Sequence, residues 1–175
     1  MKILDLFHPL SRRIDELFMG TPKPTEWSSQ VEMGVPTWKS YFTFPGQNGD
    51  LRVDIELISD QDQIMGKYMF KANGLRISPR ARGFGVNFAV DGEMDVTSRL
   101  GPRAARLIDE VVSRCMHFWN QHDEFSYVVF TGAEGSRNRL YNAMARRLAA
   151  MAGAKLMTKR DDFLIYLPAA ADQDK

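Results

Sequence analysis

The chain has 175 residues, of which 44% are hydrophobic and 26% are charged, and its formal net charge is +1. This size and composition are typical of one globular domain whose core needs no disulfide staples. The small net charge gives no electrostatic indication of a nucleic-acid or membrane surface. The single cysteine, Cys115, cannot form an internal disulfide, and no apolar run approaches the ~20 residues of a membrane span. We therefore expect a cytoplasmic protein.

The first twenty residues carry apolar side chains at helical intervals, but Pro9 interrupts the pattern. Proline removes a backbone hydrogen bond and clashes with the preceding turn. A short first segment is therefore expected, followed by a helix from about Pro9 to Met19. This amphipathic piece would cover the protein's own sheet or dock on a partner.

A long connection is predicted over Gly20–Pro36, which is rich in proline, glycine, serine and threonine. Trp27 lies inside it, and we expect this side chain to anchor the connection on the body of the protein. The expected organisation is thus an N-terminal helix and loop over residues 1–36, a domain over 37–168 and a disordered tail over 169–175.

The next part of the chain predicts four consecutive strands. The first two alternate apolar and polar side chains, and a turn rich in glycine and asparagine joins them. Alternation of this kind is typical of half-buried antiparallel strands with one side toward a core. The expected strands span residues 38–44, 51–58, 64–71 and 84–90.

A helix, a strand, a second helix and a hairpin follow. Pro102 suits the first turn of a helix over residues 101–119, whose apolar side chains form one stripe. Phe125–Phe130 is apolar, aromatic and β-branched, which predicts a strand covered on both faces. Ser136 is a suitable N-cap for the second helix, and Gly153 stands where a left-handed residue should end it. The hairpin strands are expected at residues 154–158 and 163–167.

This order predicts an α/β (α+β) fold: a single domain with a mixed, mostly antiparallel sheet and flanking helices. The last half of the chain resembles the GCN5-related N-acetyltransferase (GNAT) family. There, a strand leads into a helix with a pattern like N/S-x-x-(R/A)-x-L-Y, and two last strands follow. The matching residues are Ser136, Arg137, Leu140 and Tyr141. The chain is also similar to GNAT-like proteins encoded by phages and mobile elements, which would place it in a host cytoplasm.

The resemblance implies transfer of an acetyl group from acetyl-CoA to an amine of a small molecule or a protein. In the family, the pantetheine of the cofactor pairs with a splayed strand, which corresponds here to Phe88 and Val90. Its pyrophosphate lies on backbone amides at the N-terminus of the following helix, where orphan N–H groups and the helix dipole favour anions.

The family pattern at that helix is Q/R-x-x-G-x-G/A, and this chain keeps only Gly101 of its glycines. Arg103 replaces the small residue, and Pro102 removes an amide. Arg99 and Arg103 would instead bring side-chain charge to the pyrophosphate. Ser136 is a further candidate contact with the cofactor. The glycine-containing run at residues 80–85 leads into a strand, so it lacks the context of a phosphate loop.

Tyr141 occupies the position at which many GNAT enzymes protonate the departing CoA thiolate. The alternative is that Tyr141 belongs to the buried stripe of its helix. No general base stands out; by position alone the candidates are Glu93, Asp95, Glu134 and His122. The three scattered histidines and the one cysteine offer no metal-ligand spacing.

A second hypothesis is that the chain has a GNAT-like fold but does not catalyse acetyl transfer. The altered phosphate loop favours a catalytically inactive GNAT-fold protein that works through protein–protein contacts, with a protein partner or as a homo-oligomer. Basic side chains near residues 71–82 and on the second helix can contact phosphates, but acidic residues elsewhere balance them.

Overall fold

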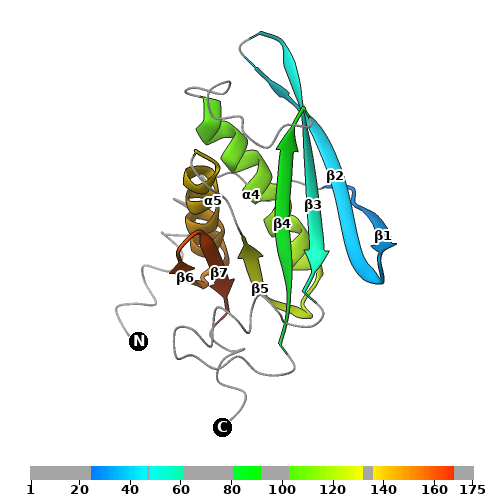
Figure 1. Cartoon of the computed structure of the whole chain (residues 1–175), viewed down its shortest axis with the longest axis vertical. Coiled ribbons are helices and arrows are strands. Elements are labelled where there is room, and N and C mark those ends of the chain that lie inside the picture. The colour runs from blue at the N-terminus through cyan, green and yellow to red at the C-terminus, as the bar shows by residue number, and fades with distance from the viewer. Residues whose placement is uncertain (1–24, 47, 61–80, 92–102, 132–135, 168–175) are drawn as a thin grey trace, which may run out of the picture.

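The computed structural model describes residues 25–46, 48–60, 81–91, 103–131 and 136–167. Within these ranges the chain forms a mixed α/β fold, in which one seven-stranded sheet carries two helices on one face (Figure 1). The strands are β1 (Ser28–Glu32), β2 (Val35–Pro45), β3 (Asp50–Ser59), β4 (Arg82–Val90), β5 (Phe125–Phe130), β6 (Lys155–Lys159) and β7 (Asp162–Tyr166). The helices are α4 (Ala104–Gln121) and α5 (Ser136–Ala152). Neither described helix is long and apolar enough to cross a membrane.

The strand order is β1-β2-β3-β4-β5-β7-β6, and the described neighbours are antiparallel except β4 and β5. Antiparallel neighbours can follow one another through short turns, whereas a parallel pair needs a crossover, and α4 lies in that crossover. The sheet is therefore two antiparallel pieces, β1–β4 and β5–β7, that meet along one parallel seam.

The expected connection at residues 20–36 is wrong over Ser28–Glu32, which forms β1 and pairs with β2. The two strands are joined by Met33 and Gly34, whose φ angles of 49° and 81° give the left-handed pair that tight hairpins favour. The predicted anchoring of Trp27 is confirmed, because its ring packs edge-on against Phe118 of α4 with centroids 5.5 Å apart.

The alternation predicted for β2 and β3 is confirmed. Phe42 and Phe44 of β2 and Ile55 of β3 are buried on the side that faces the helices, whereas Tyr41 is exposed on the other side. The third expected strand at 64–71, the N-terminal helix and the tail lie outside the described residues.

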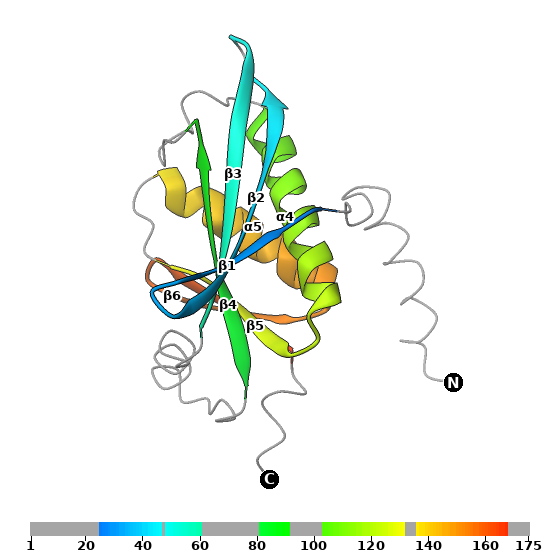
Figure 2. The same cartoon turned by 90° about the vertical axis from the view of Figure 1, so that its right-hand side faces the viewer.

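Both helices use the predicted apolar stripes to cover the same face of the sheet, and Figure 2 shows them together on one side of it. The buried residues of α4 are Leu107, Ile108, Val111, Val112, Ser113, Cys115, Phe118 and Trp119. Gly153 ends α5 with a φ of 62°, as expected for a left-handed terminating residue. Trp119 donates its indole N–H to the carbonyl oxygen of Phe125 at 2.7 Å, which fixes the end of α4 to the start of β5.

The prediction that β5 is covered on both faces is also confirmed. Phe125 and Phe130 belong to the core under the helices, whereas Tyr127 and Val129 belong to a second buried cluster with Leu164. The hydroxyl group of Tyr127 donates a hydrogen bond to the carboxylate of Asp60 at 2.8 Å.

Candidate functional site

The parallel strands β4 and β5 separate half-way along β4. Their pairing runs from Arg82↔Phe125 to Gly85↔Val129, with an irregularity after Arg82. β4 continues to Val90, and beyond Gly85 its register is described only with β3. Figure 1 accordingly shows β5 beside the lower part of β4 alone. The upper part of β4 thus borders a gap in the described sheet.

Backbone directions show which groups of β4 face this gap. The carbonyl oxygen of Gly83 accepts a hydrogen bond from the amide of Asp60 at 2.9 Å, and the amide of Asp91 donates to the Arg52 carbonyl oxygen at 2.8 Å. Backbone groups alternate along a strand, so the odd-numbered residues of β4 point toward β3. The N–H and C=O groups of Phe88 and Val90 therefore point away from β3, into the gap.

Tyr141 lies on the helix side of the same gap. Its ring is completely buried and contacts the rings of Phe88 and Phe130, with centroids 5.6 Å and 5.4 Å away. These two partners belong to the strands that separate. The alternative that Tyr141 belongs to the buried stripe of α5 is therefore confirmed as a description of its packing, while its catalytic role stays a prediction.

The N-terminus of α4 lies at the same end of the sheet as Val90. Arg103 is the N-cap residue, it makes no side-chain capping bond, and the first turn of α4 contains no acidic residue. Free amides at a helix start favour an anion. The guanidinium of Arg103, however, donates to the carbonyl oxygens of Pro45 (3.1 Å) and Gly46, so this side chain ties the β2–β3 turn to the helix.

The remaining sequence-predicted contacts are placed only in part. Ser136 is the first residue of α5, and its side chain is not described. Arg99 and Gly101 lie outside the described residues, as do three of the candidate bases, Glu93, Asp95 and Glu134.

The fourth candidate base, His122, does not belong to this site. It follows the C-terminus of α4, stacks on Phe118 with centroids 4.1 Å apart, and pairs with Glu124 at 3.1 Å. Its ring also neighbours Phe125, the residue that pairs with Arg82 at the start of β4. Six residues of strand separate Arg82 from Phe88, which is roughly 20 Å at about 3.3 Å per residue.

Sequence reasoning missed two carboxylates, those of Asp54 and Glu56, which line a surface hollow together with residues of β4. This hollow of about 340 Å³ is lined by Phe88 and Asn87 of β4 and by Asp54 and Glu56 of β3. Glu56 lies opposite Asn87 in the sheet and pairs with Lys39 at 3.4 Å. The alternation of β3 already predicted that both acidic side chains point away from the core, but it could not show that β4 pairs with β3 at these residues.

An ion pair holds the two helices together near the start of α4. Arg147 of α5 donates to Asp109 and, at 3.0 Å, to the carbonyl oxygen of Ala105. Partial burial raises the pKa of the Asp109 carboxyl group, and the charge of Arg147 opposes this rise. The contact fixes the first turns of α4 against α5, and so the relative position of the helix N-terminus and Tyr141.

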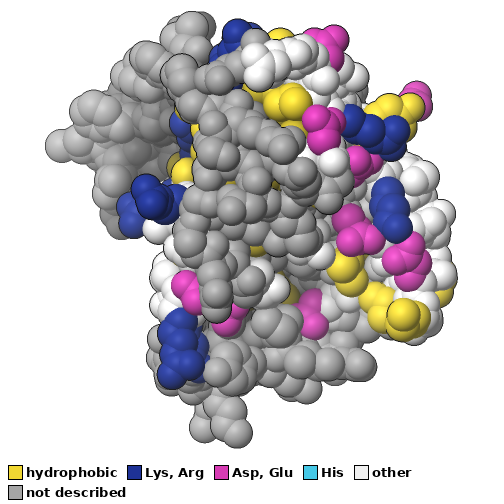
Figure 3. Space-filling view, turned by 45° about the horizontal axis from the view of Figure 1, so that its top comes forward, with side chains coloured by type: hydrophobic (Ala, Val, Ile, Leu, Met, Phe, Trp, Pro, Cys, Tyr) yellow, Lys and Arg dark blue, Asp and Glu magenta, His cyan; other side chains and the backbone are white. Residues whose placement is uncertain are grey.

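No family model matches the chain, and comparisons with curated proteins and with solved structures find no match. The described side chains also contain no group of three or more His, Cys, Asp or Glu residues that could hold a metal ion. Figure 3 shows basic and acidic side chains next to one another on the described part of the visible face, without a basic patch.

Proposed function

We propose that this protein is a GNAT-like N-acyltransferase that moves an acetyl group from acetyl-CoA to an amine. The observation that carries the proposal is the separation of β4 and β5, because it presents the backbone groups of Phe88 and Val90 to a gap. Unpaired backbone groups need hydrogen-bond partners, and the amide-containing pantetheine arm of CoA offers both donors and acceptors. The order of strands and helices supports the same fold.

The reaction requires few groups from the protein. The amine nitrogen attacks the thioester carbonyl carbon, a C–N bond forms, the C–S bond breaks, and the amine proton passes to a base. The thiolate leaves more easily when it receives a proton, for which the Tyr141 hydroxyl is the candidate donor. Glu56 is a candidate base because it shares the hollow with Phe88. The start of α4 would take the pyrophosphate.

Two substitutions at one position test the backbone contact. Val90→Pro and Val90→Ala both remove the valine side chain, but only proline removes the N–H that faces the gap. We expect the titration of acetyl-CoA by calorimetry to show at least about tenfold weaker binding for Val90→Pro than for Val90→Ala, since one hydrogen bond to a buried group is worth about 1–2 kcal/mol. Equal affinities of the two folded variants would contradict the proposed pairing.

The role of Tyr141 needs a separate measurement. Tyr141→Phe keeps the ring between Phe88 and Phe130 and removes only the hydroxyl. We expect unchanged affinity for acetyl-CoA and about 10²-fold slower release of the CoA thiol to an amine acceptor, as for the loss of a general acid. If the folded wild-type protein binds no acetyl-CoA at millimolar concentration, the proposed acyltransferase activity is refuted.

The second candidate is an inactive protein of the same fold that acts by protein–protein contact. Two observations favour it: Arg103 is engaged by the β2–β3 turn, and the edge strand β1 exposes Val31 by 69%. Exposed edge strands are templates for pairing with another chain. Sedimentation of the wild type and of Val31→Lys would distinguish the interaction protein from the acyltransferase. A partner or a second copy that pairs with β1 would be lost in the variant, whereas acetyl-CoA binding would not change.

A further inference from the structure

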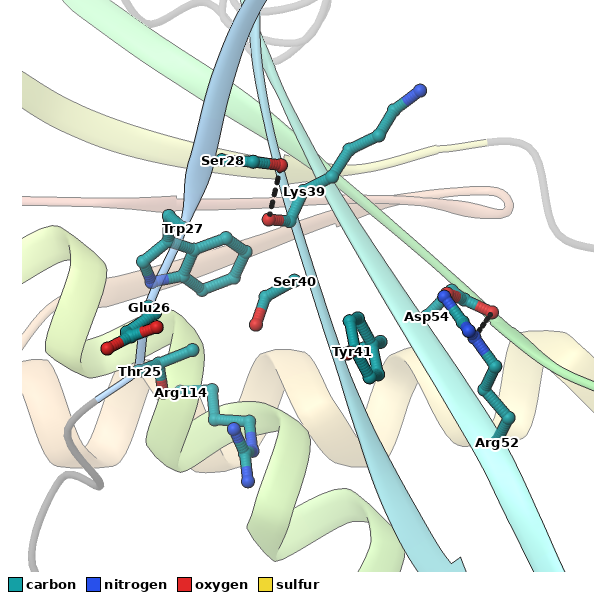
Figure 4. Close-up of a pocket in the computed structure, with 10 residues that line it drawn as sticks. All are labelled: Thr25, Glu26, Trp27, Ser28, Lys39, Ser40, Tyr41, Arg52, Asp54 and Arg114. Atoms are coloured by element: carbon teal, nitrogen blue, oxygen red, sulfur yellow. Dashed lines mark hydrogen bonds and ion pairs between the residues drawn. The ribbon is translucent and has the colours of Figure 1, made fainter.

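A separate cavity of about 690 Å³ lies where β1 leaves the edge of β2, on the far side of β3 from the β4–β5 gap (Figure 4). β1 follows β2 only as far as Ser28↔Lys39, and the Ser28 hydroxyl donates to the Lys39 carbonyl oxygen at 3.2 Å. By strand alternation, the backbone groups of Tyr41 also face this edge, where no described strand pairs with them. The volume is in the range of small-molecule sites.

Arg114 of α4 lines this cavity, and its guanidinium is only weakly paired with the described residues. Its side chain is only 18% exposed, and its Cζ lies 4.3 Å from the centre of the Phe42 ring. The ion pair with Glu110 is long, at 3.8 Å from Nε to Oε2, which exceeds hydrogen-bond distance. Nε is buried without an acceptor among the described residues. An arginine offers five donors, and burying them unpaired is costly.

Trp27 forms another part of the cavity wall. Its Nε1 has no acceptor in the described chain, but this atom is buried, so the indole presents its ring to the cavity and not its N–H. Trp119 provides the contrast, since its indole N–H donates to a carbonyl oxygen at 2.7 Å. A buried tryptophan usually has such a partner. Figure 4 shows the side chains of Trp27 and Arg114 on the same side of β2, one from the segment before β1 and the other from α4.

The other charges of the cavity wall decide which acceptor fits. Arg52 pairs with Asp54 at 3.0 Å, and Lys39 pairs with Glu32 at 2.6 Å, so these cations are neutralised. Arg114 keeps the least satisfied positive charge, whereas Glu26 adds negative charge to the wall. A singly charged oxyanion fits this balance, and the second charge of a phosphate would face Glu26.

We propose that this cavity binds a ligand through one carboxylate, whose oxygens accept hydrogen bonds from the guanidinium of Arg114. The aromatic surfaces of Trp27 and Tyr41 in the wall favour an apolar body on that ligand. Acetyl-CoA is not involved, so a negative result for this site would not affect the acyltransferase proposal, and a negative result for acetyl-CoA would not affect this site.

The indole N–H resonances of the full-length protein test the site directly. The chain has three tryptophans, and Trp27→Phe assigns the signal of interest. Benzoate is the probe, and benzamide is its neutral counterpart of the same shape. We expect benzoate to shift the Trp27 indole signal saturably and to leave that of Trp119 unchanged, whereas benzamide and inorganic phosphate produce no saturable shift.

The matched variants are Arg114→Gln and Arg106→Gln, which remove one charge each from the same helix; Arg106 is exposed and does not line the cavity. We expect at least about tenfold weaker benzoate binding for Arg114→Gln and no change for Arg106→Gln, because hydrogen bonds to charged groups are the strong ones. If Arg114→Gln does not fold, the rise in Tm caused by benzoate in the wild type must decrease in Trp27→Phe. Equal binding by the two arginine variants, or equal shifts with benzamide or phosphate, would overturn the proposal.

Discussion

The substitution Gly83→Ala tests the seam between β4 and β5. A Cβ atom at Gly83 would lie 2.0, 2.2 and 2.5 Å from the Cε2, Cδ2 and Cζ atoms of Tyr127. At Gly85, two residues further along the same strand, a Cβ atom would meet only backbone oxygens of Val129 and Ile58, at 3.8 and 3.9 Å. Gly85→Ala is therefore a matched control with the same chemical change and no collision.

The cost follows from what Tyr127 must give up. Carbon atoms pack at about 3.5 Å, so the ring must move by roughly 1.5 Å. Tyr127 is completely buried and donates to Asp60, so the movement loses about 1 kcal/mol of hydrogen bonding and about 1–3 kcal/mol of packing. We expect Gly83→Ala to lower the free energy of unfolding by about 2–4 kcal/mol, which lowers Tm by roughly 5–15 °C at this chain length.

Urea denaturation followed by circular dichroism measures this cost. Gly85→Ala should remain within about 1 kcal/mol of the wild type, because an alanine that fits restricts the unfolded chain. In a Tyr127→Ala background, Gly83→Ala should cost no more than Gly85→Ala, since the colliding ring is gone. A full cost of Gly83→Ala in that background would refute the assignment to the Tyr127 ring, as would a wild-type stability of the single variant.

Three further expectations concern buried or partly buried charge. Burial raises the pKa of the Cys115 thiol from 9.0 to about 12. The folded state therefore holds this proton more tightly, so the stabilisation is complete below about pH 9 and is lost as the pH rises toward 12. In urea titrations across that window, the wild type should lose up to about 1.4 kcal/mol per pH unit more than Cys115→Ala, and parallel curves would contradict this. Arg114→Met should raise Tm in the absence of ligand, because it removes a poorly paired buried charge; a fall in Tm would show that Arg114 is satisfied. Arg147→Met should cost about 1–2 kcal/mol and move the pKa of Asp109 further upward in NMR titration, because it removes the opposing charge.

The strands and helices could be predicted wherever one face is buried. Alternation in β2 and β3 and the apolar stripes of α4 and α5 directly reflect contact with a single core. β1 was missed because its residues are exposed on nearly every side, so no alternation marks them. Only the turn at Met33 and Gly34 gave a local signal, and it lies in a segment whose composition is typical of loops.

The candidate sites depended on information that a local pattern does not contain. Phe88 and Val90 came from a resemblance, and the directions of their backbone groups followed only from the register with β3. Arg114 stands at a stripe position of α4, three residues after Val111 and four before Phe118, and an arginine there was a usable signal. Its position over the Phe42 ring and in the cavity wall with Trp27, however, depends on residues that are distant in sequence.

The single parallel seam also determines the order in which the sheet can form. The partners in β1–β2–β3 and in β6–β7 are near one another along the chain, whereas Val53 and Val90 are 37 residues apart, Tyr127 and Tyr166 are 39 apart, and Gly83 and Tyr127 are 44 apart. Closing a loop of that length loses chain entropy before any seam contact compensates for it. The local units β1–β2–β3 and β6–β7 are thus expected to form early, and the rate of folding is set by the joining of β4 and β5 to them and to each other. A substitution between β4 and β5, such as Gly83→Ala, would therefore change the rate of folding as well as the stability of the folded state.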